Sequence, residues 1–146
     1  MAAPTFNSTR NAWERADTEF TDFFELVDPT ADDQITLFRT RKAGRITACR
    51  WVPKATLAAG TANYYQIGLV NGGTNADASG TVAIASQVGG TNSGGTAPGW
   101  TADTDVDIPI TGTGTFVASE AIVVDYDETG TVTPSGLLQV SYRYDP

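Results

Sequence analysis

The sequence of 146 residues contains no histidine and a single cysteine, Cys49. A serine or cysteine nucleophile needs a nearby base, which in most enzymes is a histidine, so this common kind of hydrolytic site is excluded. One cysteine cannot form an intrachain disulfide. Cys49 lies in an alternating segment, where it either packs as a small apolar side chain or presents a surface thiol. No catalytic residue and no cofactor is predicted.

Long apolar runs are also missing from the sequence. No segment approaches the roughly 20 apolar residues that span a bilayer, and the N-terminus lacks the basic start and apolar core of a signal peptide. We therefore expect a soluble protein that is made in the cytoplasm and has no membrane partner.

Basic residues are scarce and unevenly placed. Nine Lys and Arg stand against 17 Asp and Glu, which gives a net charge of -8, and seven of the nine precede position 51. A surface this acidic repels phosphate backbones, and the basic residues near the N-terminus are interleaved with acidic ones. Nucleic-acid binding is therefore not expected.

The chain is rich in short segments that alternate apolar and polar residues, separated by Gly, Thr, Asn and Pro. Such alternation places successive side chains on opposite faces, as half-buried strands require. The pattern predicts eight strands, at 20–27, 33–41, 45–52, 63–70, 81–87, 105–110, 121–126 and 137–144. Eight short strands with turn signals between them favour an all-β, two-sheet antiparallel β-sandwich, with a jelly roll preferred over an immunoglobulin-like sandwich.

Residues 1–19 lack this alternation and are predicted to form an N-terminal arm or short helix ahead of a β-sandwich domain at 20–146. Ser8 or Thr9 would cap such a helix, and Trp13 would lie on its apolar side.

Three carboxylates at alternating positions, Asp103, Asp105 and Asp107, are the strongest candidate for a metal site. Their spacing fails the calcium-loop pattern, because Ile108 and Gly114 stand where that loop needs Gly and Glu. We interpret the segment as the solvated face of a strand and predict no metal.

A second acidic group, Asp125, Asp127 and Glu128, precedes a Thr-Gly turn and is interpreted as a solvated strand edge. Glu120 and Asp125 would supply the two carboxylates of a glycosidase, but no spacing signature accompanies them.

Aromatic side chains offer another route to function. Trp51, Trp100, Tyr64 and Tyr65 would form a stacking platform for sugars if they gathered on one face of the sandwich. Tyr64 and Tyr65 point to opposite faces of an extended segment, so at most one of them joins such a platform. The alternatives are core packing and subunit contact, where aromatic residues are also enriched.

Several segments together resemble the capsid decoration (cement) proteins of tailed bacteriophages, which have a jelly-roll domain. The similarity spans roughly residues 44 to 144 and rests on strand and turn residues. It is carried by 44–55, 63–70, 100–102, 106–110, 117–118, 122–124 and 134–142.

The resemblance implies a non-enzymatic structural virion protein that binds the outer surface of a phage capsid and stabilises contacts between major capsid subunits. It also implies a homo-oligomer, with a trimer favoured over a dimer, that is made in the bacterial host cytoplasm. The charge asymmetry would then turn the Arg-richer N-terminal third toward the capsid.

Arg10, Trp13 and Arg15 are the candidate partner-binding residues of the N-terminal arm, because Trp and Arg are enriched at interface hot spots. Trp51 and Trp100 are further candidates for partner binding. A terminus without function is the alternative for the arm. For the whole protein, the alternative is a carbohydrate-binding or receptor-binding β-sandwich module of a phage fibre.

Overall fold

The structure is a computed structural model that describes most of the chain. The described residues are 4–7, 12–15, 18–27, 34–59, 63–72, 82–89, 99–132 and 135–146. These ranges contain strands and no helix, and hence no helix long and apolar enough to cross a membrane. The all-β prediction is confirmed for this part of the chain.

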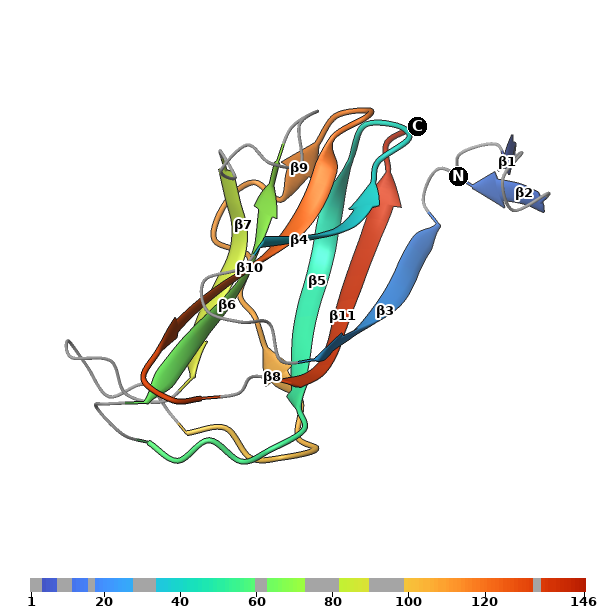
Figure 1. The fold of residues 1–146 in the computed structure, drawn as a ribbon. Coiled ribbons are helices and arrows are strands. Elements are labelled where there is room, and N and C mark those ends of the chain that lie inside the picture. The colour runs from blue at the N-terminus through green and yellow to red at the C-terminus, as the bar shows by residue number, and fades with distance from the viewer. Residues whose placement is uncertain are drawn as a thin grey trace.

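Two antiparallel sheets pack face to face (Figure 1). The first sheet contains, in spatial order, β3 (Glu19–Val27), β11 (Ser135–Tyr144), β5 (Gly44–Pro53) and β8 (Val106–Asp107), and β9 (Thr115–Phe116) pairs with the beginning of β5. The second sheet contains β4 (Gln34–Arg39), β10 (Ala121–Thr129), β6 (Tyr64–Asn71) and β7 (Val82–Gly89). The predicted two-sheet sandwich is confirmed.

The strand pairing is nested about the β6–β7 pair. Outward from that pair, β5 pairs with β8 and β9, β4 pairs with β10, and β3 pairs with β11, always antiparallel. Two further pairings, β6 with β10 and β5 with β11, join these pairs into sheets. A long antiparallel ribbon folded over itself in this way is a jelly roll, so the preferred topology is the one observed.

Period-two alternation builds the core between the sheets. Along β3 the side chains of Phe20 and Leu26 are buried, whereas Phe23 and Val27 are exposed on the opposite face. The central strand β6 is buried over most of its length, because neighbouring strands cover both of its edges and the first sheet covers its inner face. Each large apolar side chain that is fully buried stabilises the fold by about 1.5–3 kcal/mol.

Register shifts in β4, β5 and β7 interrupt the alternation. In β5 the extra residue is Thr47, and the inward-facing positions change phase across it. Ile46 before the shift is buried, and Cys49 and Trp51 after it are buried as well. A bulge adds one residue to one strand of a pair, and here it allows both halves of β5 to face the core.

The N-terminal segment forms a hairpin rather than a helix. β1 (Pro4–Asn7) pairs antiparallel with β2 (Ala12–Arg15), beside the sandwich in Figure 1. The short-helix alternative is therefore wrong for residues 12–15. An aromatic residue in each strand, Phe6 and Trp13, and the β-branched Thr5 favour extended backbone. Ser8 and Thr9, the expected helix caps, lie outside the described residues.

The predicted strand at 105–110 is shorter in the structure. β8 ends at Asp107, and Pro109 follows, which has no N–H to donate to a ladder. Ile110 then forms a single bridge with Ala85 of the second sheet. The chain therefore crosses between the sheets here, and the two-residue strand β9 beyond the crossing was not predicted.

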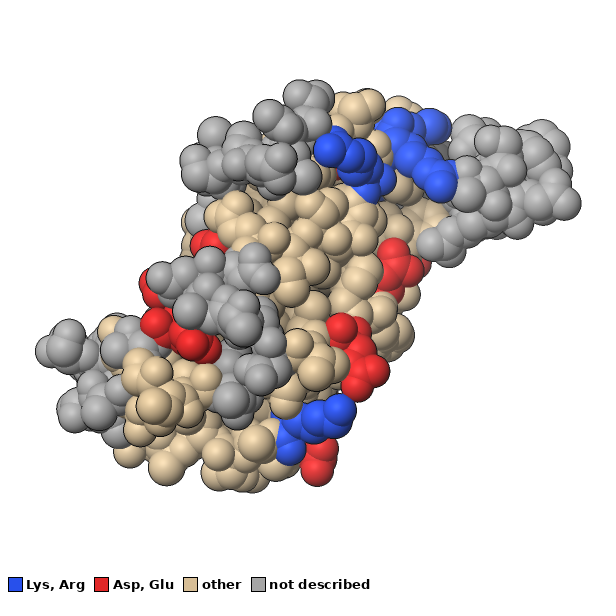
Figure 2. Space-filling model, viewed as in Figure 1, with Lys and Arg blue, Asp and Glu red and all other residues tan. Residues whose placement is uncertain are grey.

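The two ends of the sandwich differ in charge. The turn between β4 and β5 carries two cations, and the strands beside it add three more: Arg39, Arg41, Lys42, Arg45 and Arg143. We call these five residues the basic end, and basic side chains gather at the top of Figure 2, near the C-terminus marked in Figure 1. The opposite end, where β6 and β11 begin, is called the pocket end.

Candidate functional site

Trp51 and Trp100 lie in the core and not on the surface. Trp51 is fully buried on β5, and Trp100, which bridges to Leu57, is 3% exposed. The prediction that these side chains contact a partner must be corrected, because neither indole is accessible in the folded chain. Alternation in the sequence did not say which face of β5 is inward, and the bulge at Thr47 changes the phase.

At the pocket end the two indoles belong to a cluster of four rings, completed by Tyr65 and Tyr126. The ring centroids of Tyr65 and Trp100 are 4.9 Å apart, and those of Trp51 lie 6.4 Å from Tyr65 and 6.5 Å from Tyr126. All three pairs are close to perpendicular. Edge-to-face pairs of this kind stabilise a core by about 0.5–1.5 kcal/mol each beyond their burial. We call this group the Trp/Tyr cluster.

One hydrogen bond links polar atoms of the cluster. Trp51 Nε1 donates to the hydroxyl oxygen of Tyr65 at 2.9 Å. Burial raises the pKa of Tyr65 to about 12, and the bond from Trp51 opposes that rise. Burial also raises the pKa of Tyr126, with a further contribution from Tyr65. Both hydroxyls are therefore neutral at physiological pH and are poorly suited to act as bases.

Two other polar atoms of the cluster have no hydrogen-bond partner within the described part of the chain. They are Trp100 Nε1 and the hydroxyl oxygen of Tyr126, and both are buried. A buried polar group without a partner costs about 1–3 kcal/mol. The cluster therefore combines large apolar contacts with an unfavourable polar contribution.

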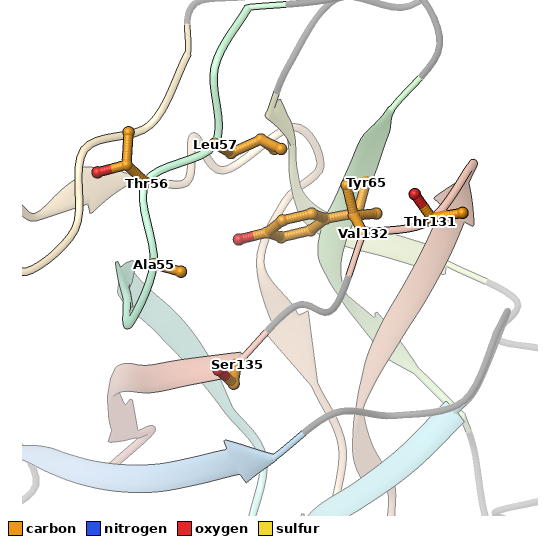
Figure 3. Close-up of a pocket in the computed structure, with 7 residues that line it drawn as sticks. All are labelled: Ala55, Thr56, Leu57, Tyr65, Thr131, Val132 and Ser135. Carbon is orange, nitrogen blue, oxygen red and sulfur yellow. The ribbon is translucent and has the colours of Figure 1, made fainter.

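A pocket of about 180 Å³ lies beside the Trp/Tyr cluster (Figure 3). Its lining residues are Ala55, Thr56, Leu57, Tyr65, Thr131, Val132 and Ser135. In Figure 3 the ring of Tyr65 lies across the pocket, and its hydroxyl points toward the segment that carries Ala55 and Thr56. The lining contains hydroxyl and apolar groups but no carboxylate, amine or thiol. Such a pocket provides no acid–base pair for catalysis.

The stacking platform expected for a sugar ligand is not formed by these residues. Trp51, Trp100 and Tyr65 are all buried, so none of them presents a ring face to solvent. Tyr64 is partly exposed at the start of β6, but one ring next to buried neighbours is no platform. Core packing, one of the alternatives for these aromatic residues, is the role that the structure gives to the three buried ones.

Cys49 packs in the core as a small apolar side chain. Burial raises the pKa of its thiol to about 12, and the charge of Asp107 adds to the rise. Because the thiolate is the reactive form, this cysteine is unreactive in the folded protein. The surface-thiol alternative is therefore wrong.

The acidic residues at 103–107 do not converge. Asp105 lies 3.8 Å from Arg50, in an ion pair that is largely exposed, and Asp103 is in a turn with a φ of 57°. Within the described residues, no group of three or more His, Cys, Asp or Glu side chains is placed to hold a metal ion. Farther along the chain, Asp125 accepts a hydrogen bond from Gln34 Nε2 at 3.0 Å.

The candidate partner-binding residues of the N-terminus are only partly placed. Arg10 lies outside the described residues. Trp13 and Arg15 belong to β2, where the backbone pairs Trp13 with Phe6 and Arg15 with Pro4. Their role in contacting a partner stays a prediction.

An exposed apolar surface on the first sheet was missed by the sequence reasoning. Phe23 and Val27 on β3 are 60% and 69% exposed, and Leu137 on β11 is 38% exposed. Leu137 pairs with Glu25, midway between Phe23 and Val27, so the three apolar side chains are neighbours on one face. We call them the apolar strip. Consecutive phenylalanines at 23 and 24 were the available signal, because one of them must face outward.

Comparisons with known proteins identify no family. No protein-family model matches the chain, and no curated protein does. Among solved structures, a chain in the structure of infectious bursal disease virus, Gx strain, is similar, with a TM-score of 0.32 and 14% sequence identity. The match covers 97% of this chain and 37% of that chain, so our chain spans little more than a third of its length. A similarity of this degree assigns no function.

Proposed function

We propose that the protein is a non-enzymatic structural virion protein that binds the outer surface of a phage capsid. In this role it stabilises contacts between major capsid subunits, and it acts as a homo-oligomer, with a trimer favoured. The resemblance of residues 44–144 suggests this role. The quoted segments correspond to the jelly-roll strands β5, β6, β8, β10 and β11, together with the turns around them.

The observation that carries the proposal is the apolar strip on the edge of the first sheet. Neighbouring apolar side chains that are exposed on a soluble protein often mark a binding surface. β3 is also the edge strand of its sheet, and long edge strands with apolar side chains attract further protein chains. A protein that acts through its surface in this way needs no reaction centre.

The proposed activity follows from mass action. A protein that binds only the assembled shell stabilises that shell in proportion to the logarithm of its occupancy. An oligomer engages several capsid subunits at once, and the second contact then forms at a high effective concentration. Closed cyclic symmetry would let each copy present the same surfaces to equivalent subunits.

Co-sedimentation of the purified protein with expanded and unexpanded capsid shells of its own source tests the proposal. We expect saturable binding to expanded shells at a fixed ratio to the major capsid subunit. Absence of binding to both forms would contradict the proposal.

A second experiment tests self-association of the purified protein. Phe23→Ser with Val27→Ser removes most of the apolar strip and is expected to lower the oligomeric state measured by analytical ultracentrifugation. Val117→Ser, at another exposed apolar position, is the matched control and should leave it unchanged.

A further inference from the structure

The basic end concentrates positive charge on an otherwise acidic molecule. Its cations come from the turn that joins β4 to β5, from the adjoining ends of these two strands, and from the adjacent end of β11. Arg41 and Lys42 are exposed in that turn, and Arg45 is exposed at the start of β5. In Figure 2 basic side chains at this end form neighbouring groups, with acidic side chains farther along the molecule.

Two arginines at this end lie directly opposite each other. Arg143 of β11 pairs with Arg45 of β5 across the ladder, on the outer face of the first sheet. Like charges directly opposite on neighbouring strands are destabilising. Glu19 is the other cross-strand neighbour of Arg143, but its carboxylate accepts a hydrogen bond from Thr47. The arrangement favours a negatively charged group from outside the chain.

The cations of the basic end differ from Arg50 and Lys54 in whether they form ion pairs with acidic side chains. At the pocket half of the molecule, Lys54 Nζ lies 3.1 Å from Glu25 and Arg50 lies 3.8 Å from Asp105. Within the described ranges, Arg41, Lys42, Arg45 and Arg143 form no ion pair. The charges of Arg50 and Lys54 are therefore balanced by acidic side chains of the chain itself, whereas those of Arg41, Lys42, Arg45 and Arg143 are not balanced by an ion pair in the described residues.

The acidic surface around the basic end restricts the chemical class of a partner that binds there. Three acidic residues border its five cations: Glu19, Glu120 and Asp145. Apart from the hairpin of β1 and β2, the rest of the described chain has two cations, Arg50 and Lys54, and eight acidic residues, namely Asp22, Glu25, Asp103, Asp105, Asp107, Asp125, Asp127 and Glu128. A long polyanion such as duplex DNA would be repelled outside this small area. Separate carboxylates on a protein surface can contact this small area alone and would not meet that repulsion.

We propose that the basic end docks onto a carboxylate-rich surface of a partner protein. The inference rests on the proposed function, in which that partner is the assembled capsid shell. Four of the five cations are arginines, whose planar guanidinium groups bind carboxylates through paired hydrogen bonds. The positive end of the molecule turns toward the shell, and the acidic remainder faces away from it.

A matched pair of charge reversals tests this inference by co-sedimentation with expanded shells. The salt concentration is about 0.1 M, at which surface charges still interact over about 10 Å. Arg41→Glu with Lys42→Glu alters the basic end, and Arg50→Glu with Lys54→Glu makes the same change in net charge elsewhere. We expect the first variant to bind about tenfold more weakly and the second to change binding less than about twofold. Unchanged melting temperatures would show that both variants are folded.

The outcomes separate this inference from the proposed function. Suppose that the wild-type protein binds shells. If the two variants then lose affinity equally, or if neither variant loses affinity, the basic end is not the docking surface and the inference is overturned. If the wild-type protein binds neither form of the shell, the proposed function fails and the inference falls with it. Binding to duplex DNA that Arg41→Glu with Lys42→Glu abolishes would overturn the choice of a carboxylate partner.

Discussion

The two ends of the core are closed by aromatic clusters of different chemistry. Near the basic end, Phe20, Phe38 and Phe116 pack against Tyr142 and Tyr144, with ring centroids between 5.0 and 6.5 Å apart. Most of these rings carry no polar atom. At the pocket end, every ring of the Trp/Tyr cluster carries one, and all four rings are buried.

The difference shows what polar atoms cost inside a sandwich. In the phenylalanine-rich cluster, the hydroxyl of Tyr142 donates to Asp22 at 2.9 Å, in a position that is only partly buried. In the Trp/Tyr cluster, the bond from Trp51 to Tyr65 is fully buried, and two further polar atoms have no partner in the described chain. The buried polar atoms of the Trp/Tyr cluster therefore depend on the bond from Trp51 to Tyr65, whereas the polar atom of Tyr142 bonds a partly exposed carboxylate.

Removal of one large ring at each end is expected to have the largest effect on stability. Trp51→Ala is expected to lower the free energy of unfolding by about 3–5 kcal/mol through lost burial and cavity formation. It also leaves the Tyr65 hydroxyl without its donor, so the loss should exceed that of Phe116→Ala at the other end. Urea unfolding measures both. An equal or larger loss for Phe116→Ala would contradict the special dependence of the pocket end on its polar pair.

Removal of a single hydroxyl at each end isolates the contribution of the polar atom from that of the ring. Tyr65→Phe keeps the ring but leaves Trp51 Nε1 buried without an acceptor, which should cost about 1–3 kcal/mol. Tyr142→Phe breaks a bond whose acceptor, Asp22, can be hydrated by solvent, and should cost about 1 kcal/mol or less. Chemical denaturation of the two variants gives the values, and equal losses would show that burial does not set the cost.

Alkaline pH provides the smallest and most selective test. In the folded chain the pKa values of Cys49 and Tyr65 are raised to about 12 from 9.0 and 10.0. Because the unfolded chain releases these protons first, stability is fully present below pH 9 and is lost as the pH rises toward 12. Between pH 8 and 10 we expect a loss of about 1–2 kcal/mol.

A cysteine variant serves as the control for the pH experiment. Cys49→Ala removes the group with the lower unfolded pKa, so its stability should fall less steeply between pH 8 and 10, when measured by urea unfolding at each pH. The same slope for the variant and the parent protein would mean that Cys49 does not contribute to the pH dependence.

Strand positions were predictable from the sequence because alternation and turn residues are local signals. The segment 63–70 became β6 at Tyr64–Asn71, and 137–144 became part of β11 at Ser135–Tyr144. The order of strands in the sheets followed from the number of strands and a preference for jelly rolls. That step relied on how eight strands commonly pack and not on any particular residue.

The inward or outward direction of a side chain was harder to predict. In a regular strand Ile46 and Trp51 face opposite sides, and the sequence offered no sign that Thr47 is an inserted residue. The bulge turns both inward, so Trp51, a candidate for partner binding, lies in the core. The basic end was only partly anticipated, because Arg143 is distant in sequence and reaches Arg45 through the pairing of β11 with β5.

The nested pairing also has a consequence for how the molecule folds. Thr21 and Ser141 share a hydrogen bond across 120 positions of sequence, and β11 must reach the first sheet before β3 has any strand to pair with. Closing so long a loop costs conformational entropy before the contacts between β3 and β11 stabilise the fold. Folding is therefore expected to be slow for a domain of this size. Until β11 arrives, β3 has an unpaired backbone along both edges, which is the state most exposed to chaperones and to misassociation.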